Sequence, residues 1–307
     1  MSGRRGLVVV LAVLLLGGAA VLLGDIEHGV SFSSILEIWA DVLRDTDQFG
    51  FRLTRVSAPE EIRVGKELAG EIARWWREDP EWAPYVSAVG RTLLPHIHRT
   101  AITYEFHVIE SRQINAFALP GGQIFVMRGM LEFLRSEAEL AAVLGHEISH
   151  VDLRHCIERH QYELAMRKVG AGEVGALAEI ARRLLTIGYT KYQELEADAH
   201  GMRLSVLAGY DPEASAAMFN RLRERYRERT PPRARTPVGE VGQAVEQAMA
   251  SYFRTHPPSV ERVRQLERLV RQNRQRLAGQ TFYTGVENYR VRISRSQQEF
   301  PEERHRF

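Results

Sequence analysis

The chain has 307 residues, and its 41 basic and 39 acidic side chains leave a formal net charge of +2. Hydrophobic residues make up 44% and charged residues 26%, which is ordinary globular usage and excludes a disordered or collagen-like chain. The mean hydropathy of -0.27 excludes a chain that is embedded mostly in a membrane. The near-neutral charge argues against a dedicated nucleic-acid-binding protein, so no nucleic acid is expected as a partner.

Cysteine usage limits the kinds of metal site that the chain can build. Cys156 is the single cysteine of the sequence. An intramolecular disulfide and a cysteine-based metal cluster are therefore both excluded. Any metal site must be built from histidine, aspartate and glutamate side chains.

The N-terminus carries an uncharged apolar run over residues 7–24, preceded by Arg4 and Arg5. As a helix rising about 1.5 Å per residue, the run would be about 27 Å long, enough to cross a bilayer core. We expect residues 1–24 to be a membrane anchor, with a cleaved signal segment as the alternative. The flanking charges then predict a single pass through the cytoplasmic membrane, with the rest of the chain outside it. A cleaved segment would leave the protein periplasmic.

The next segment, residues 25–56, is expected to lie near the membrane. Residues 31–45 are amphipathic, and they predict a helix that lies at the membrane interface or packs on the main domain. A second helix is predicted from Ser57 to about Trp76, because Ser57 is a suitable cap and a proline and two acids follow it.

Strand and helix patterns then alternate along the chain. Residues 103–110 alternate between apolar and polar side chains and predict a half-buried strand. A second strand is predicted over 123–127, after the turn signal of Pro120-Gly121-Gly122. A possible strand follows at 289–294. Helical patterns cover 136–168, 173–187, 190–208, 212–229 and 259–276. The chain is therefore predicted to be an α+β protein that is predominantly α-helical.

The sequence His146-Glu147-Ile148-Ser149-His150 lies inside the strongest predicted helix. His146 and His150 are four residues apart and about 40° apart around the helix, so both imidazoles can reach one ion at about 2.0–2.1 Å. Glu147 is rotated by about 100° from His146 and lies beside the ion, where it can accept a proton from water. The alternative is a solvent-facing helix that carries two histidines.

A third metal ligand is expected from a later helix, because a catalytic zinc usually has three protein ligands. Glu194 and Asp198 are four residues apart and share a helix face. Glu194 is the candidate ligand, and Asp198 can accept a hydrogen bond from a ligating histidine. Glu196 is rotated by about 200° from Glu194 and is expected to point elsewhere.

The remaining histidines near these motifs are expected to be structural or exposed. His155 and His160 step away from the metal face along their helix, and His200 is rotated by about 240° from Glu194. His96 and His98 are expected in a surface loop, with adventitious metal binding as the alternative.

Several segments together resemble a known family. H-E-x-x-H followed by E-x-E-A-D-x-x-G resembles the gluzincin zinc metalloendopeptidases, which include the CaaX prenyl endopeptidase, the bacterial protease HtpX and the Oma-type proteases. Further similar segments follow the family's order, at residues 115–122, 137–155, 209–212 and 255–262. The resemblance implies a zincin-like metallopeptidase domain over 57–270, with a small β-sheet beside the active-site helix. Residues 271–307 then form a C-terminal extension.

The resemblance also implies roles for single residues. His146, His150 and Glu194 match the family's zinc ligands, which implies one Zn2+ per chain. Glu147 matches the general base, and Asp198 matches the carboxylate behind a ligand.

Two further residues and one strand are implicated by the resemblance. His256 matches a histidine that stabilises the oxyanion in some members and caps the zinc in some periplasmic members, which keeps them latent. Arg262 matches an arginine near the same site and is expected to help hold the oxyanion. Residues 122–127 match the strand beside the cleft, whose edge can pair with an extended polypeptide substrate.

The function implied is zinc-dependent hydrolysis of peptide bonds in unfolded or misassembled membrane or envelope proteins. A single predicted anchor is closer to the envelope quality-control members than to the members with several spans. The alternative is a latent, zinc-bound chaperone or scaffold of the same fold that cleaves little.

Overall fold

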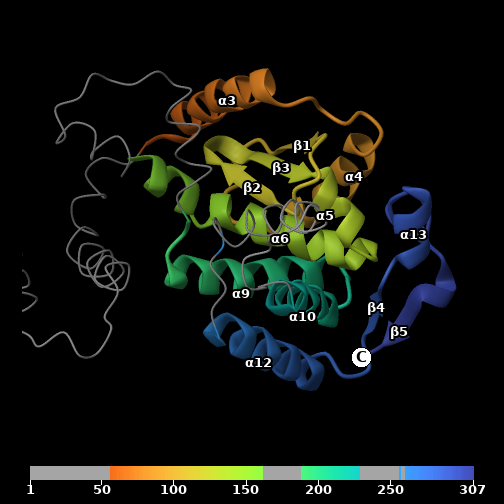
Figure 1. Cartoon of the computed structure of the whole chain (residues 1–307). Helices are drawn as coiled ribbons and strands as arrows, with labels where there is room; N and C mark the ends of the chain where they lie inside the picture. The colour runs from red at the N-terminus through yellow and green to blue at the C-terminus, as the bar shows by residue number, and fades with distance from the viewer. Residues whose placement is uncertain (1–55, 162–187, 229–255, 257–259) are drawn as a thin grey trace, which may run out of the picture. The chain divides into compact units, whose positions relative to one another are not determined.

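The computed structural model of the chain describes residues 56–161, 188–228, 256 and 260–307, which all fall in one unit, Val56–Phe307 (Figure 1). The predicted anchor and the predicted helices at 31–45 and 173–187 lie outside the described residues. Within the described ranges, no helix is both long enough and apolar enough to cross a membrane.

A three-stranded sheet lies at the centre of the described unit. Its strands are β1 (Glu105–Ile109), β2 (Ala116–Leu119) and β3 (Gln123–Met127), in the order β1-β3-β2. β1 runs parallel to β3, and β2 runs antiparallel to it. β1 and β3 confirm the two predicted strands. The sequence does not predict β2. All four of its residues are buried, so apolar and polar side chains do not alternate along it.

The sheet order corrects the expectation about the substrate-pairing strand. β3 was expected to offer a free edge, but it is hydrogen-bonded to a strand on each side. The reason is the tight connection η3 (Pro120–Gly122), in which Gly121 and Gly122 have φ values of 73° and 87° and fold β2 back onto β3. The edge strand beside the helix α6 is therefore β2.

Helices cover both faces of the sheet (Figure 1). On one face lies α3 (Ala58–Trp75), which confirms the helix predicted from Ser57. Its buried Leu68 and Ile72 pack on alternate sheet residues, namely Ile109, Phe117, Leu119, Phe125 and Met127. The intervening sheet residues face the larger core formed with α4 (Ala83–Leu93) and α6 (Glu137–Asp152). Because successive side chains of a strand point to opposite faces of the sheet, each strand contributes residues to both cores.

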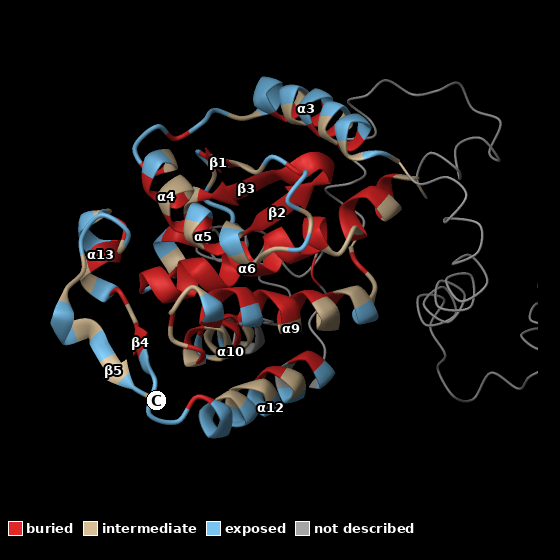
Figure 2. Cartoon of the chain, turned by 180° about the vertical axis from the view of Figure 1, so that it is seen from behind, coloured by how far each residue is buried: buried red, intermediate tan, exposed pale blue. Residues whose placement is uncertain are grey.

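The helix α6 carries the H-E-x-x-H sequence through the centre of the unit, and every one of its residues is buried (Figure 2). Ser136 caps its N-terminus by accepting a hydrogen bond from the backbone N–H of Glu139. The predicted helix over 136–168 is interrupted, because α6 ends at Asp152 and Arg154 adopts a φ of 70°. Helical structure resumes over 155–161.

The helix α9 (Lys191–Leu207) packs along α6 and confirms the helix predicted over 190–208. Thr190 and Gln193 form a reciprocal capping box at its start. The two helices approach closely at Gly145 and Gly201, since a Cβ atom on Gly201 would lie 2.7 Å from the backbone nitrogen of His146. This close approach brings the two ligand-bearing helix faces together.

The remaining elements pack around this helix pair. α10 (Glu213–Glu228) and α12 (Val260–Arg276) confirm the helices predicted over 212–229 and 259–276. Short elements complete the described residues: η2 (Leu94–His96), α5 (Arg128–Phe133), β4 (Thr281–Tyr283), α13 (Val286–Val291), η4 (Pro301–Glu303) and β5 (Arg304–Arg306). The strand predicted at 289–294 is wrong, because α13 occupies residues 289–291 and the residues that follow form no strand.

The residues after 270 dock onto the start of α6. The backbone N–H of Glu137 donates to the carbonyl of Gly285, and the Glu137 carboxylate accepts from the hydroxyls of Tyr85 and Tyr210 and from the Arg295 backbone. Burial raises the pKa of Glu137, against the opposing effect of these hydrogen bonds. The predicted extension is thus packed against the helix that carries the metal-site motif.

Candidate metal centre

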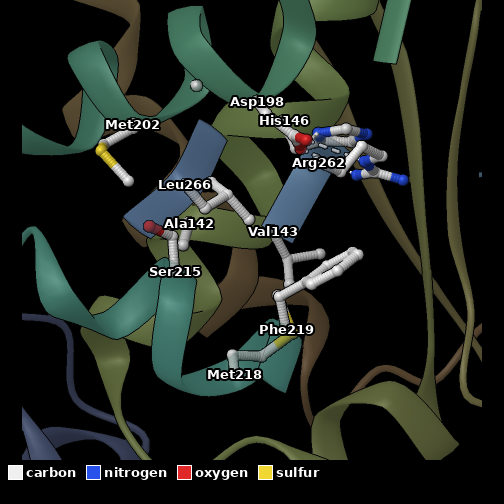
Figure 3. A pocket seen from close by; sticks show the side chains of 11 residues that line it. Ala142, Val143, His146, Asp198, Met202, Ser215, Met218, Phe219, Arg262 and Leu266 are labelled. Atoms are coloured by element: carbon white, nitrogen blue, oxygen red, sulfur yellow. Dashed lines mark hydrogen bonds and ion pairs between the residues drawn. The ribbon is translucent and has the colours of Figure 1, made fainter. Parts of the chain in front are cut away.

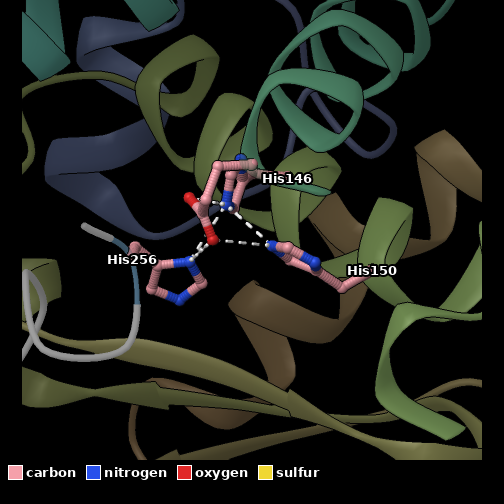
Figure 4. A group of neighbouring side chains, drawn as sticks. His146, His150 and His256 are labelled. Carbon is pink, nitrogen blue, oxygen red and sulfur yellow. Dashed lines mark hydrogen bonds and ion pairs between the residues drawn. The ribbon is translucent and has the colours of Figure 1, made fainter. Parts of the chain in front are cut away.

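The three predicted ligands meet between α6 and α9. His146 and His150 of α6 point toward each other in Figure 4, and both lie close to Glu194 of α9. The His146 Nε2 and His150 Nε2 atoms are 3.1 Å apart, and the Glu194 carboxylate oxygens lie 3.6 Å and 3.5 Å from them. All three side chains are buried.

These spacings suit a zinc ion. Ligands about 2.1 Å from a tetrahedral ion lie about 3.4 Å from one another, which is close to the separations found here. The ligand atoms of His146, His150, Glu194 and His256 all lie within 4.8 Å of one another. Both carboxylate oxygens of Glu147 are buried and accept no hydrogen bond from the described residues. A buried carboxylate in that state is costly unless a positive partner or water is supplied.

Asp198 and Arg262 contact the ligands His146 and Glu194 and fix their orientation. The Asp198 carboxylate lies 3.0 Å from His146 Nδ1, so this nitrogen donates its hydrogen and Nε2 is left to bind metal. Arg262 donates to both Asp198 oxygens, at 2.8 Å and 2.7 Å, and lies 2.6 Å from Glu194 Oε2. Arg262 thus engages the two carboxylates. These contacts are those of a positioning residue, and its expected help in holding the oxyanion stays a prediction.

The pKa values of this centre follow from burial and charge. Burial raises the pKa of Glu194, but the Arg262 and His256 charges outweigh it and leave that pKa well below its ordinary value. Asp198 behaves in the same way, with Arg262 as the main opposing charge. Burial lowers the pKa of His150 well below its ordinary value. Two carboxylates held ionised and a neutral imidazole are the protonation states that a metal ligand set requires.

The pKa of His146 shifts in the opposite direction from that of His150. Burial lowers its pKa, but the hydrogen bond to Asp198 and the Glu194 charge outweigh this effect, so the pKa is raised. A proton and a cation therefore compete for the Nε2 atom of His146.

A chain of hydrogen bonds leads away from the outer nitrogen of His150. His150 Nδ1 lies 3.1 Å from His155 Nδ1, and His155 Nε2 lies 3.3 Å from Glu196 Oε2. The prediction that both residues point elsewhere missed this contact. The turn at Leu153–Arg154 explains the miss, because it redirects the residues after α6 back toward the metal centre.

Tyr189 covers the ring of His150. The two rings stack with centroids 3.6 Å apart and an interplanar angle of 12°, and the Tyr189 hydroxyl lies 3.2 Å from Cys156 Sγ. Burial raises the pKa of the Cys156 thiol to about 12, so it stays protonated at neutral pH. No sequence pattern pointed to Tyr189, which precedes the capping box of α9.

His256 occupies the place of a fourth ligand. Its Nδ1 atom lies 3.0 Å from Glu194 Oε1 and 3.2 Å from His146 Nε2, and Figure 4 shows the His256 ring beside His146. Its Nε2 atom lies 3.3 Å from Glu147 Oε1. An open catalytic zinc site gives this fourth position to water. Of the two roles expected for His256, the conformation described here has the geometry of a cap.

A small cavity of about 20 Å³, which has room for about one water molecule, borders the centre at His146. His146, Asp198 and Arg262 gather at one end, and apolar side chains such as Met218 and Phe219 line the other (Figure 3). The side chains of the Arg262–Asp198 ion pair are only 1% and 5% exposed, so the pair is shielded from solvent and its electrostatic effect is strong.

Comparison with protein-family models matches residues 80–270 to Peptidase family M48. The matched range is more than half of the chain and contains the ligands, Glu147, Asp198, His256 and Arg262. The chain belongs to peptidase family M48. The resemblance predicted from the sequence is thereby confirmed, as is the mainly helical zincin-like fold. M48 metallopeptidases use zinc, and the buried His146–His150–Glu194 cluster fits that ion.

The chain is similar in sequence to several named metalloproteases. The mitochondrial metalloendopeptidase OMA1 of Schizosaccharomyces pombe is 30% identical over 228 residues, which is 70% of this chain and 63% of the relative. The putative beta-barrel assembly-enhancing protease of Vibrio cholerae is 33% identical over 167 residues, which is 48% of this chain and 34% of the relative. The beta-barrel assembly-enhancing protease of Escherichia coli is 30% identical over 172 residues, which is 50% and 35%. This M48 chain thus spans about a third to somewhat under two thirds of these relatives.

Proposed function

We propose that the chain is a zinc-dependent metalloendopeptidase. The observation that carries the proposal is the convergence of His146, His150 and Glu194 with Glu147 beside them in a buried site. When bound, zinc supplies Lewis-acid activation of a water molecule and of the peptide carbonyl. The family membership and the names of the relatives support the same activity.

The residues of the chain divide the work of hydrolysis. Glu147 accepts a proton from the attacking water and later delivers it to the leaving amine. Asp198 and Arg262 keep His146 and Glu194 in place and correctly ionised. Pre-arranged charges of this kind cost little reorganisation at the moment of reaction.

The polypeptide substrate is proposed to bind as an extended strand along β2. β2 is an edge strand of the sheet, and it packs against α6, which carries Glu147. An added antiparallel strand would use main-chain hydrogen bonds, which suits substrates of many sequences. Unfolded or misassembled membrane and envelope proteins, which expose extended segments, are the substrate class that we propose.

Latency is part of the proposal. With His256 Nδ1 in the fourth ligand position and its Nε2 beside Glu147, the His256 ring competes with water and substrate for the centre. His256 must leave before the site can act. A zinc-bound scaffold that cleaves little remains the second candidate function, and the same capped geometry favours it.

The location of the protein also belongs to the proposal. The apolar run over 7–24 after two arginines supports a single membrane anchor, with the catalytic unit on the outer side of the cytoplasmic membrane. The names of the bacterial relatives, beta-barrel assembly-enhancing proteases, fit a role in envelope protein quality control.

The activity is tested with the purified full-length chain and casein as an unfolded substrate. We expect the zinc-loaded protein to cleave casein, a chelator to abolish cleavage, and added Zn2+ to restore it. Cleavage that is indifferent to the chelator would contradict the metallopeptidase proposal. Stoichiometric zinc without cleavage by either the wild type or His256→Ala would favour the scaffold.

A further inference from the structure

A second group of potential metal ligands lies at the end of α6. His98 follows η2, Asp152 ends α6 and His200 belongs to α9. His200 Nε2 lies 2.8 Å from Asp152 Oδ2, and His98 Nδ1 lies 3.3 Å from the same oxygen. The two imidazole rings stack with centroids 4.8 Å apart. The three ligand atoms all lie within 4.8 Å of one another.

This group is separate from the centre at His146 and His150. At about 100° per residue, Asp152 is rotated by about 200° around α6 from His150. His200 is likewise rotated by about 240° around α9 from Glu194. Both side chains therefore point in a different direction from the ligands of the first centre, and they meet at a second place where α6 and α9 pack against each other.

The chemistry of the group suits a late first-row divalent ion. Two imidazole nitrogens and one carboxylate oxygen are a common ligand set for zinc. Asp152 and His200 are buried, whereas the His98 side chain is 59% exposed, so water can complete the coordination from that side. The Arg99 guanidinium, a nearby positive charge, is paired with Glu61 at 2.5 Å.

Backbone hydrogen bonds fix the orientation of the Asp152 carboxylate. Asp152 accepts hydrogen bonds from the backbone N–H groups of His98 and Arg99, at 2.9 Å and 2.7 Å, which fix its orientation. In the metal-free molecule, the hydrogen of His200 Nε2 fills the space between His200 and Asp152. A cation would take the place of this hydrogen, which is the usual exchange when a histidine becomes a ligand.

We propose that His98, Asp152 and His200 form a second binding site for Zn2+ or a similar late divalent ion. The ion would tie together three segments: the loop after η2, the end of α6 and the middle of α9. The ion would therefore stabilise the packing of α6 on α9 without contacting any ligand of the first centre. The proposal does not depend on the proposed peptidase function.

The test counts bound metal in the full-length chain. Metal-depleted wild type and His98→Gln are dialysed to equilibrium against buffered Zn2+, and bound zinc is measured. We expect two ions per chain in the wild type and one in His98→Gln, with equal far-ultraviolet circular dichroism. His96→Gln, two residues earlier in the same segment, is the matched control and is expected to keep both ions. His98→Cys, which supplies a thiolate ligand, is expected to restore the second ion.

Three outcomes would overturn the proposal. The first is a single ion in the wild type that His98→Gln retains, and the second is two ions in the wild type that His98→Gln also retains. The third is loss of the ion in His96→Gln as well, which would assign it to an adventitious pair of surface histidines. Thermal melting gives an independent reading, because added Zn2+ should raise the midpoint further in the wild type than in His98→Gln.

Discussion

The side chain of His256 fills a position that a catalytic metal site must leave open. Its two ring nitrogens lie 3.0 Å from Glu194 Oε1 and 3.3 Å from Glu147 Oε1, so one ring blocks both the metal and the general base. Removing the ring opens both. Under the proposed latency, the rate of hydrolysis depends on how often His256 is displaced.

We predict that His256→Ala raises casein cleavage by about tenfold or more, because a cap that leaves at most a tenth of the molecules open lowers the rate by that factor. Initial rates at equal zinc content measure the effect. A fall of about 100- to 1000-fold, the usual cost of a lost oxyanion donor, would show instead that His256 stabilises the transition state.

His155 and Glu196 are placed to orient His150. If His150 holds zinc through Nε2, its Nδ1 would carry hydrogen and donate to His155, whose Nε2 would donate to Glu196. We predict that His155→Asn and Glu196→Gln each weaken zinc binding, the first by about 10- to 100-fold. Competition with a chelator measures affinity, and the Co2+ spectrum reports the coordination geometry.

The matched control is His107→Asn, since His107 pairs with Glu78 at 2.9 Å in the sheet, away from the ligands. It should leave zinc affinity and the Co2+ spectrum unchanged. Unaltered zinc affinity and Co2+ spectrum in His155→Asn would show that the contact with His150 does not position the ligand.

How far the sequence predicts the site depends on helix geometry. His146, His150, Glu194 and Asp198 lie where spacing within regular helices places them. His155 could not be placed in this way, because the break at Arg154 ends the regular 100° rotation. The same limit applies to any residue beyond an unpredicted turn.

At the scale of elements, the closeness of α6 and α9 decides the geometry of the metal centre. Glycine faces glycine where the helices meet, and no side chain separates the backbones. The sequence shows these two glycines but not that they meet, since contacts between distant segments leave no periodic signal. The missed strand β2 is a similar case, because complete burial removes the alternation that marks a strand.

We predict that Gly201→Ala lowers the free energy of unfolding by about 1–3 kcal/mol, the usual cost of overpacking. Its Cβ would lie 2.7 Å from the His146 backbone nitrogen and would force the helices apart. The affinity for zinc should fall as well, because the ligands lie on these two helices. Urea unfolding measures the change in stability, and metal analysis at limiting zinc measures the change in affinity.

Gly70→Ala in α3 is the control, because nothing lies within 4 Å of the Cβ that it would add. It should be neutral or stabilising by up to about 1 kcal/mol, the difference in helix propensity. If Gly201→Ala unfolds at the same urea concentration as the wild type, the two helices do not depend on their close contact.

At the scale of the whole molecule, the buried charges couple folding to pH. The pKa values of Glu194 and Asp198 are lowered in the folded state, where Arg262 holds both carboxylates ionised. A carboxylate with a lowered folded pKa contributes stability above its unfolded pKa of about 4 and loses it as pH falls further.

We therefore predict that the metal-depleted chain loses stability as the pH drops below about 4, where the unfolded carboxylates take up protons. Arg262→Met should lessen this pH dependence, because it removes the charge that lowers both pKa values. Denaturant unfolding at several pH values measures the slope. An unchanged slope in Arg262→Met would show that these carboxylates are not coupled to Arg262.

The central claim is that the buried centre performs metal-dependent peptide hydrolysis with Glu147 as the general base. The most direct measurement compares wild type and Glu147→Gln, each purified as the full-length chain with its zinc content determined. We predict equal zinc content and a loss of casein cleavage of about 100-fold or more, since general acid–base catalysis contributes about 10²–10⁴-fold. Undiminished cleavage by a zinc-loaded Glu147→Gln protein would contradict the account.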